Sequence, residues 1–77
     1  MIRTLVKTEN VAVDNRTYPV RYFESRTPRG LRRYSAEIML APGDRVILDD
    51  DSVNNLEARA TRLVPATVYS RMLARTA

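Results

Sequence analysis

The 77-residue sequence contains no cysteine and no histidine. It therefore cannot form a disulfide, use a thiolate nucleophile, bind a structural zinc ion or run a histidine-based catalytic triad. Its only two glycines, Gly30 and Gly43, lie far apart, so no glycine-rich phosphate-binding loop is present. Because these absences close most short routes to catalysis, we expect no enzyme activity and no bound cofactor.

Long hydrophobic runs are also missing, since the longest apolar stretches span only three or four residues, at 38–41, 46–48 and 63–66. A membrane-spanning helix needs roughly 20. Arg3 and Lys7 interrupt the N-terminal residues, which therefore lack the apolar segment of a secretory signal. We expect a single domain over residues 1–77, located in the cytoplasm and with no membrane partner.

The charges form blocks along the chain. The net charge is +4, from 13 basic and 9 acidic residues. Residues 16–33 carry six arginines and one acid, and residues 37–57 carry six acids and one arginine. Such blocks can pair within the chain, pair with another copy, or leave the basic block for a polyanion.

Alternating apolar residues from Val11 to Leu48 predict three consecutive hairpins. The predicted loops are Asn15-Arg16, residues 26–30 and residues 42–44. The expected cross-strand pairs are Val13 with Tyr18, Tyr22 with Tyr34, Glu24 with Arg32, Ile38 with Leu48, and Met39 with Ile47. Residues 2–8 either add a strand or begin the first one, and the pattern does not decide between them.

After Leu48 the apolar period changes to about 3.6, which predicts a helix. Its expected inward residues are Val53, Leu56, Ala60 and Leu63. Asp51 or Ser52 can cap its start, whereas Pro65 predicts a break or kink near Leu63, with a second short helix over 65–74. The expected fold is α+β: an antiparallel β-meander of four or five strands, followed by one or two C-terminal helices packed on one face.

Two surface features are candidate binding sites. Phe23, Met39 and Ile47 form an apolar spot on the sheet face opposite the core, which predicts a cover by a second helix, the N-terminal segment or another chain. An arginine group around the second hairpin is a candidate polyanion-binding site, because guanidinium groups pair well with phosphates. Its members are Arg21, Arg26, Arg29, Arg32 and Arg33.

The acidic triplet Asp49–Asp51 is the obvious candidate for a Mg²⁺ or Ca²⁺ site. It does not follow the EF-hand pattern, which requires glycine where Asn54 stands and glutamate where Ala60 stands. We therefore interpret the triplet as the entrance to the helix and expect no metal.

No stretch of the sequence resembles a family with an assigned function. The leading hypothesis is a small non-enzymatic protein–protein interaction module whose partner is another protein or a second copy, as in a homodimer. The alternative is a nucleic-acid-binding domain that uses the arginine-rich loop over 26–33. The two hypotheses differ in whether acidic groups of the protein neutralise that loop.

Overall fold

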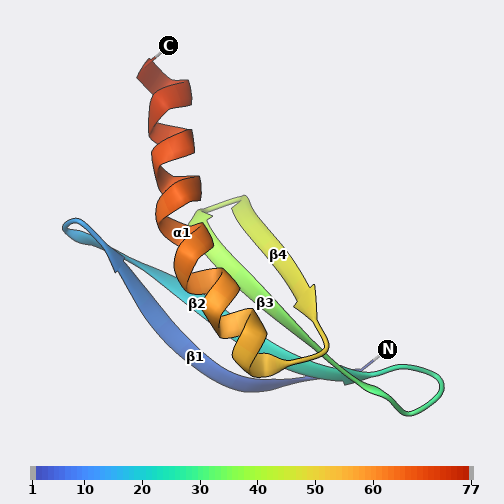
Figure 1. The fold of residues 1–77 in the computed structure, drawn as a ribbon. Coiled ribbons are helices and arrows are strands. Elements are labelled where there is room, and N and C mark those ends of the chain that lie inside the picture. Colours follow the sequence, from blue (N-terminus) through green and yellow to red (C-terminus); the bar gives the residue numbers. More distant parts are fainter. Residues whose placement is uncertain (1, 77) are drawn as a thin grey trace.

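A computed structural model of the chain describes residues 2–76 and consists of one antiparallel sheet and one long helix (Figure 1). The strands follow one another across the sheet in chain order, so they form a meander. The elements are β1 (Arg3–Val13), β2 (Arg16–Arg26), β3 (Arg32–Ala41), β4 (Asp44–Asp50) and α1 (Val53–Thr76). The predicted α+β class, with four strands before a C-terminal helix, is confirmed.

Each hairpin turns at a residue that tolerates a positive φ. These residues are Asp14 (φ 56°), Gly30 (φ 84°) and Gly43 (φ 78°). In the second hairpin, Thr27 also closes the loop, because its hydroxyl oxygen accepts a hydrogen bond from the amide of Leu31 at 3.1 Å. The loops are therefore Asp14-Asn15, residues 27–31 and Pro42-Gly43.

These loops correct the predicted register of all three hairpins by two residues. The observed pairs include Val11 with Tyr18, Tyr22 with Ala36, Glu24 with Tyr34, Ile38 with Val46, and Met39 with Arg45. Side chains alternate with a period of two, so a slip of two residues leaves every side chain on its predicted face. The faces were therefore predicted correctly and the individual partners were not.

Residues 3–13 form one strand, which settles the question of residues 2–8. The strand is irregular, because its register against β2 shifts between Leu5 and Lys7. This bulge reverses the alternation, so that Arg3 and Leu5 lie on one face of the sheet whereas Lys7 and Val11 lie on the other.

The core lies between α1 and one face of the sheet. The buried apolar residues are Val13, Val20, Tyr22, Ala36 and Ile38 from the strands and Leu56, Ala60, Val64 and Val68 from the helix. The four helix residues recur at intervals of four, so they form one stripe against the sheet. Leu63, which was predicted to point inward, is only partly buried beside this stripe.

The predicted break at Pro65 is wrong, because α1 continues without interruption from Val53 to Thr76. A proline inside a helix removes one backbone hydrogen bond and costs roughly 3 kcal/mol. Val64 and Val68, which flank Pro65, are both buried against the sheet, and their burial favours one continuous helix. No helix within residues 2–76 is long and apolar enough to cross a membrane.

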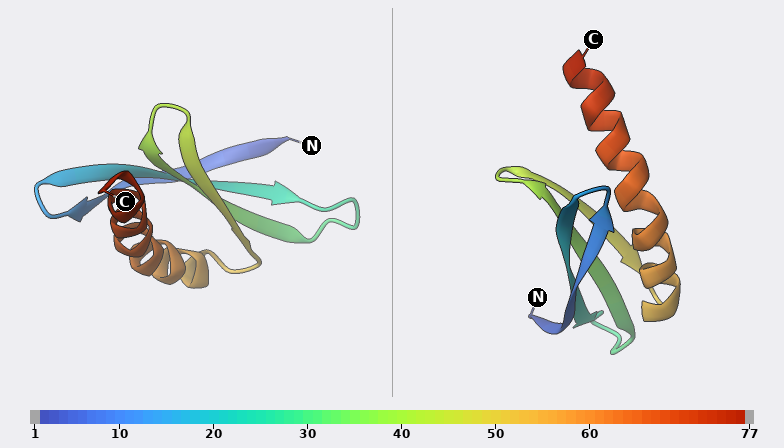
Figure 2. Two further views of the ribbon diagram at one scale, coloured as in Figure 1. Left: turned by 90° about the horizontal axis from the view of Figure 1, so that it is seen from above. Right: turned by 90° about the vertical axis from the view of Figure 1, so that its left-hand side faces the viewer.

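The molecule is elongated, with principal extents of 46, 19 and 18 Å. The β2–β3 loop projects at one end and the C-terminal part of α1 at the other (Figures 1 and 2). The two projecting segments are therefore far from each other.

Candidate functional site

Within residues 2–76, no helix lies over the face of the sheet opposite α1, and we call this face the open face (Figure 2). Strand alternation and the pairing register assign side chains from all four strands to it. Its members include Arg3, Leu5, Arg21, Phe23, Arg33, Ser35, Glu37, Met39, Arg45, Ile47 and Asp49. The three residues predicted as a self-association patch, Phe23, Met39 and Ile47, are all among them.

The centre of the open face is a buried carboxylate. The side chain of Glu37 is only 1% exposed, because arginines from three other strands surround it. Arg21 donates a hydrogen bond to its Oε1 atom. On its Oε2 atom, Arg45 Nη1 lies at 3.3 Å and Arg3 Nη2 at 3.6 Å.

This arrangement keeps Glu37 ionised. The hydrogen bond from Arg21, helped by the charges of Arg45 and Arg3, holds the pKa of the Glu37 carboxyl below its usual value of 4.5 even though burial acts in the opposite direction. Three positive groups therefore surround one negative group. Sequence patterning placed Glu37 on this face but did not identify the cluster, which depends on the correct register and on the bulge that positions Arg3.

The three arginines remain accessible, with 46% to 57% of each side chain exposed. A guanidinium has five N–H donors, and one carboxylate cannot engage all of those that three arginines offer. The guanidinium of Arg3 also lies over the ring of Phe23, with its carbon 4.0 Å from the ring centroid, which is a cation–π contact. The cluster thus presents unused donors beside an aromatic ring.

The apolar side chains of the open face lie around this cluster. Phe23 and Met39 are partly buried, whereas Leu5 and Ile47 are each about half exposed. The predicted direct pairing of Met39 with Ile47 is wrong: Met39 is paired with Arg45, and Ile47 with Glu37, so Met39 and Ile47 are diagonal neighbours. Of the predicted covers, a second helix is absent from the described residues, and residues 3–13 are a strand of the sheet itself.

The arginines predicted to bind a polyanion divide into two groups. Arg21 belongs to the Glu37 cluster, whereas the other four lie on the projecting β2–β3 hairpin. The predicted ion pair of Arg32 with Glu24 is present at 3.6 Å, although the two residues are diagonal neighbours rather than direct partners. Arg32 instead lies directly opposite Arg26.

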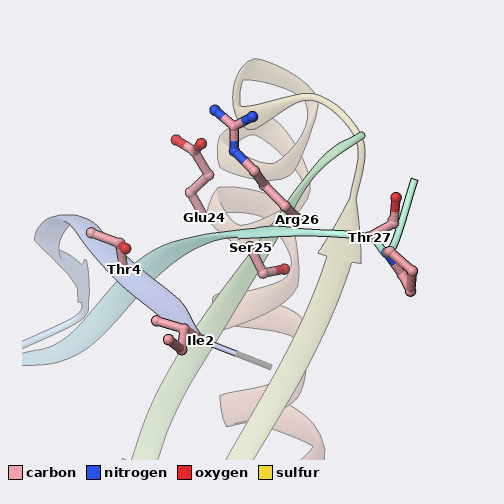
Figure 3. A pocket seen from close by; sticks show the side chains of 7 residues that line it. Ile2, Thr4, Glu24, Ser25, Arg26 and Thr27 are labelled. Carbon is pink, nitrogen blue, oxygen red and sulfur yellow. The ribbon is translucent and has the colours of Figure 1, made fainter. Parts of the chain in front are cut away.

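The remaining hairpin arginines are not engaged in ion pairs in the described part of the chain. Within residues 2–76, Arg26, Arg29 and Arg33 make no ion pair. A hollow of about 540 Å³ lies between this hairpin and the start of β1, and Glu24 and Arg26 extend from the same side of β2 beside it (Figure 3). The sequence left open whether acidic groups of the protein neutralise this loop. Within residues 2–76, Glu24 pairs with Arg32, and no acid of residues 37–57 makes an ion pair with a hairpin arginine.

The acidic triplet is built into the start of α1. Asp50 Oδ1 accepts the amide hydrogen of Ser52 at 3.0 Å, and its Oδ2 atom lies 3.1 Å from Arg59 Nη1. The Ser52 amide and then Arg59 lower the pKa of Asp50. Ser52, not Asp51, provides the cap, because its Oγ accepts the amide hydrogen of Asn55 at 3.3 Å. No three acidic side chains within residues 2–76 come together as a metal site would require.

No protein-family model matches the chain, and neither the curated proteins nor the solved structures contain a significant match.

Proposed function

We propose that this chain is a small non-enzymatic protein–protein interaction module and that the open face is its contact surface. The observation that carries this proposal is the Glu37 cluster, in which half-exposed arginines surround an ionised carboxylate among apolar side chains. Protein interfaces are enriched in aromatic residues, methionine and arginine. The open face combines all three.

The net charge of the open face indicates what kind of protein would bind it. Its arginines are Arg3, Arg21, Arg33 and Arg45, and its acids are Glu37 and Asp49, which leaves a net charge of +2. Two copies meeting through this face would bring like charges together, which is unfavourable. The partner is therefore another protein, with carboxylates arranged around an apolar contact.

The test uses the intact chain as bait in a nuclease-treated lysate. The bait variant Leu5→Asp, Ile47→Asp should lose the proteins that the wild type retains, because both side chains lie on the open face and neither is buried. Leu31→Asp is the matched control, since Leu31 is an exposed apolar residue of the hairpin loop. Retention of the same proteins by both variants, or no specific protein retained by the wild type, would contradict the proposal.

A second candidate function is nucleic-acid binding by the β2–β3 hairpin. Arg26 and Arg32 lie directly opposite each other, which is unfavourable for like charges, and Arg26, Arg29 and Arg33 have no acidic partner within residues 2–76. A phosphate backbone would supply the missing negative charge.

Fluorescence anisotropy with labelled single-stranded and duplex oligonucleotides tests this candidate. Affinity should fall steeply between about 50 and 200 mM salt, because each neutralised phosphate releases counterions. Arg26→Gln, Arg29→Gln should weaken binding more than Arg16→Gln, Arg62→Gln, which removes the same charge elsewhere. Equal losses in the two variants would indicate a nonspecific effect of net charge, and no binding at low salt would remove the candidate.

A further inference from the structure

The C-terminal part of α1 extends past the sheet (Figure 1). Within residues 53–75, Val68 is the last buried residue of the helix. Beyond it, Tyr69, Met72 and Leu73 are 49%, 51% and 70% exposed. Their spacing of three and four residues places them on one side of the helix. This end of the helix therefore presents an apolar stripe that the sheet does not cover.

A groove of about 490 Å³ lies beside the stripe, between the helix end and the β1–β2 turn. Its apolar lining includes Val13, Tyr18, Leu40 and Val68, and its polar lining includes Asp14, Arg16 and Arg75. Met72 belongs to both the stripe and the groove. The protruding side chains and the groove thus adjoin on one element.

The helix end is held in place at this groove. Arg71 donates to both carboxylate oxygens of Asp44, at 3.0 Å from Nε and 3.3 Å from Nη2. This pairing fixes the helix against the β3–β4 turn, and it raises the pKa of Arg71. The groove is therefore an organised surface, with one wall anchored by a two-point contact.

We propose that a second copy of this chain covers this surface. The two α1 ends pack antiparallel about a two-fold axis near Met72, and Tyr69 and Leu73 of each copy enter the groove of the other. A two-fold contact is self-complementary, so one arrangement covers both stripes and fills both grooves. The apolar spacing along this part of the helix is suited to helix–helix packing.

The charges around the groove allow a complementary ion pair with a second copy. Arg71 and Asp44 pair with each other. The other charged residues on the rim are Asp14, Arg16 and Arg75, and none of them makes an ion pair within residues 2–76. An antiparallel arrangement carries the last turn of one helix past the β1–β2 turn of the other. Arg75 of one copy can then meet Asp14 of the other, twice per dimer.

This contact does not depend on the proposed function. The groove is lined by Val68, Arg71 and Met72 of α1, and α1 lies on one side of the sheet (Figure 2). The dimer therefore leaves the open face of each copy accessible. A dimer would carry two open faces, and a partner that displays several acidic segments would bind it with avidity.

Sedimentation velocity from low to high micromolar concentration tests the dimer. The wild type should sediment with twice the 8.8 kDa mass of one chain. Leu73→Glu and Tyr69→Lys should each give the mass of one chain with unchanged circular dichroism, because neither side chain is buried in the monomer. Ile47→Glu on the open face is the matched control and should remain dimeric. A monomeric wild type, a dimeric Leu73→Glu, or a monomer produced only by Ile47→Glu would overturn the proposal.

A double-mutant cycle tests the antiparallel arrangement. Asp14→Asn keeps a residue type that tolerates the positive φ of this turn, and Arg75→Gln keeps the length of the side chain. Each should raise the dimer dissociation constant about two- to fivefold, and the double variant should resemble either single variant. Additive effects would show that the two groups do not meet and would overturn this geometry.

Discussion

The hydroxyl of Tyr22 donates a hydrogen bond to Glu9 Oε1 at 2.8 Å, from a tyrosine whose side chain is fully buried. Glu9 Oε2 lies 3.7 Å from Lys7 Nζ, and Lys7 also pairs with Glu57 of α1. The ammonium of Lys7 stands 5.1 Å from the centroid of the Tyr22 ring. A chain of polar contacts therefore connects β2 through the edge strand β1 to the helix.

This relationship predicts a loss of stability in alkali. Burial, and then the hydrogen bond to Glu9, raise the pKa of Tyr22 above its usual value of 10.0. Because the folded pKa lies above the unfolded one, this stabilisation is complete below about pH 10 and is lost as the pH rises further. Urea midpoints measured from neutral pH to pH 11 should fall for the wild type and fall less for Tyr22→Phe. At a protein concentration where the chain is monomeric, Tyr69→Phe is the control because Tyr69 is half exposed in one chain. Equal slopes in all three proteins would contradict the assignment.

The Glu37 cluster predicts sensitivity to acid. The folded pKa of Glu37 lies below its unfolded value of 4.5, so this stabilisation is present above that pH and is lost as the pH falls through the folded pKa. Glu37→Gln should cost about 1–3 kcal/mol at neutral pH and flatten the acid limb of the stability curve. Glu24→Gln, which removes the partner of Arg32 only, should leave that limb nearly unchanged. An unaltered acid limb in Glu37→Gln would show that another carboxylate controls it.

The hydrogen bonds at the start of α1 predict that variants of three residues lose stability by different amounts. Ser52→Ala should reduce the free energy of unfolding by about 0.5–2 kcal/mol, because it removes the acceptor for the Asn55 amide. Asp50→Asn should also lower the free energy of unfolding, since the Asp50 carboxylate accepts hydrogen bonds from the Ser52 amide and from Arg59. Asp51→Ala should have the smallest effect of the three. Chemical denaturation ranks them, and a larger loss in Asp51→Ala than in Ser52→Ala would reassign the cap.

Pro65 predicts a stabilising substitution. Pro65→Ala restores an amide inside a helix that already continues past this position, so it should raise the free energy of unfolding, by up to about 3 kcal/mol. Thermal and urea unfolding should both shift upward, with more helical signal in circular dichroism. Ala66→Pro, one residue later on the exposed side, should have the opposite effect. If Pro65→Ala left stability unchanged, the helix would not depend on this backbone bond.

Sequence patterning predicted the faces of the fold more accurately than its pairings. A period of two places Val20, Tyr22 and Ile38 on the core side in any register that differs by two residues. The register was decided instead by local backbone preferences: Asp14 adopts the left-handed region, Thr27 closes its own loop, and Gly43 follows Pro42 in a two-residue turn. The alternation of apolar and polar residues does not reflect these backbone preferences, so it could not predict the register.

The candidate site was harder to predict for the same reason. Phe23, Met39 and Ile47 were placed together on the uncovered face from their alternation. The Glu37 cluster required two further facts: the register that puts Arg45 diagonal to Glu37, and the bulge that turns Arg3 toward it. The C-terminal part of α1 was hard to predict because Pro65 has an intrinsic tendency to break helices. The packing of Val64 and Val68 against the sheet outweighs that tendency.

The bulge in β1 has a consequence for solubility. β1 is an edge strand of 11 residues. Near its start, Ile2 is largely exposed, and Leu5 and Val6 are about half exposed. A regular apolar edge of this length is a template on which further chains can add strands and grow a fibre. The shift of register between Leu5 and Lys7 leaves Val6 outside the ladder and interrupts the row of outward-facing amides. One additional residue therefore makes this edge of the sheet a poorer template for strand addition by another chain.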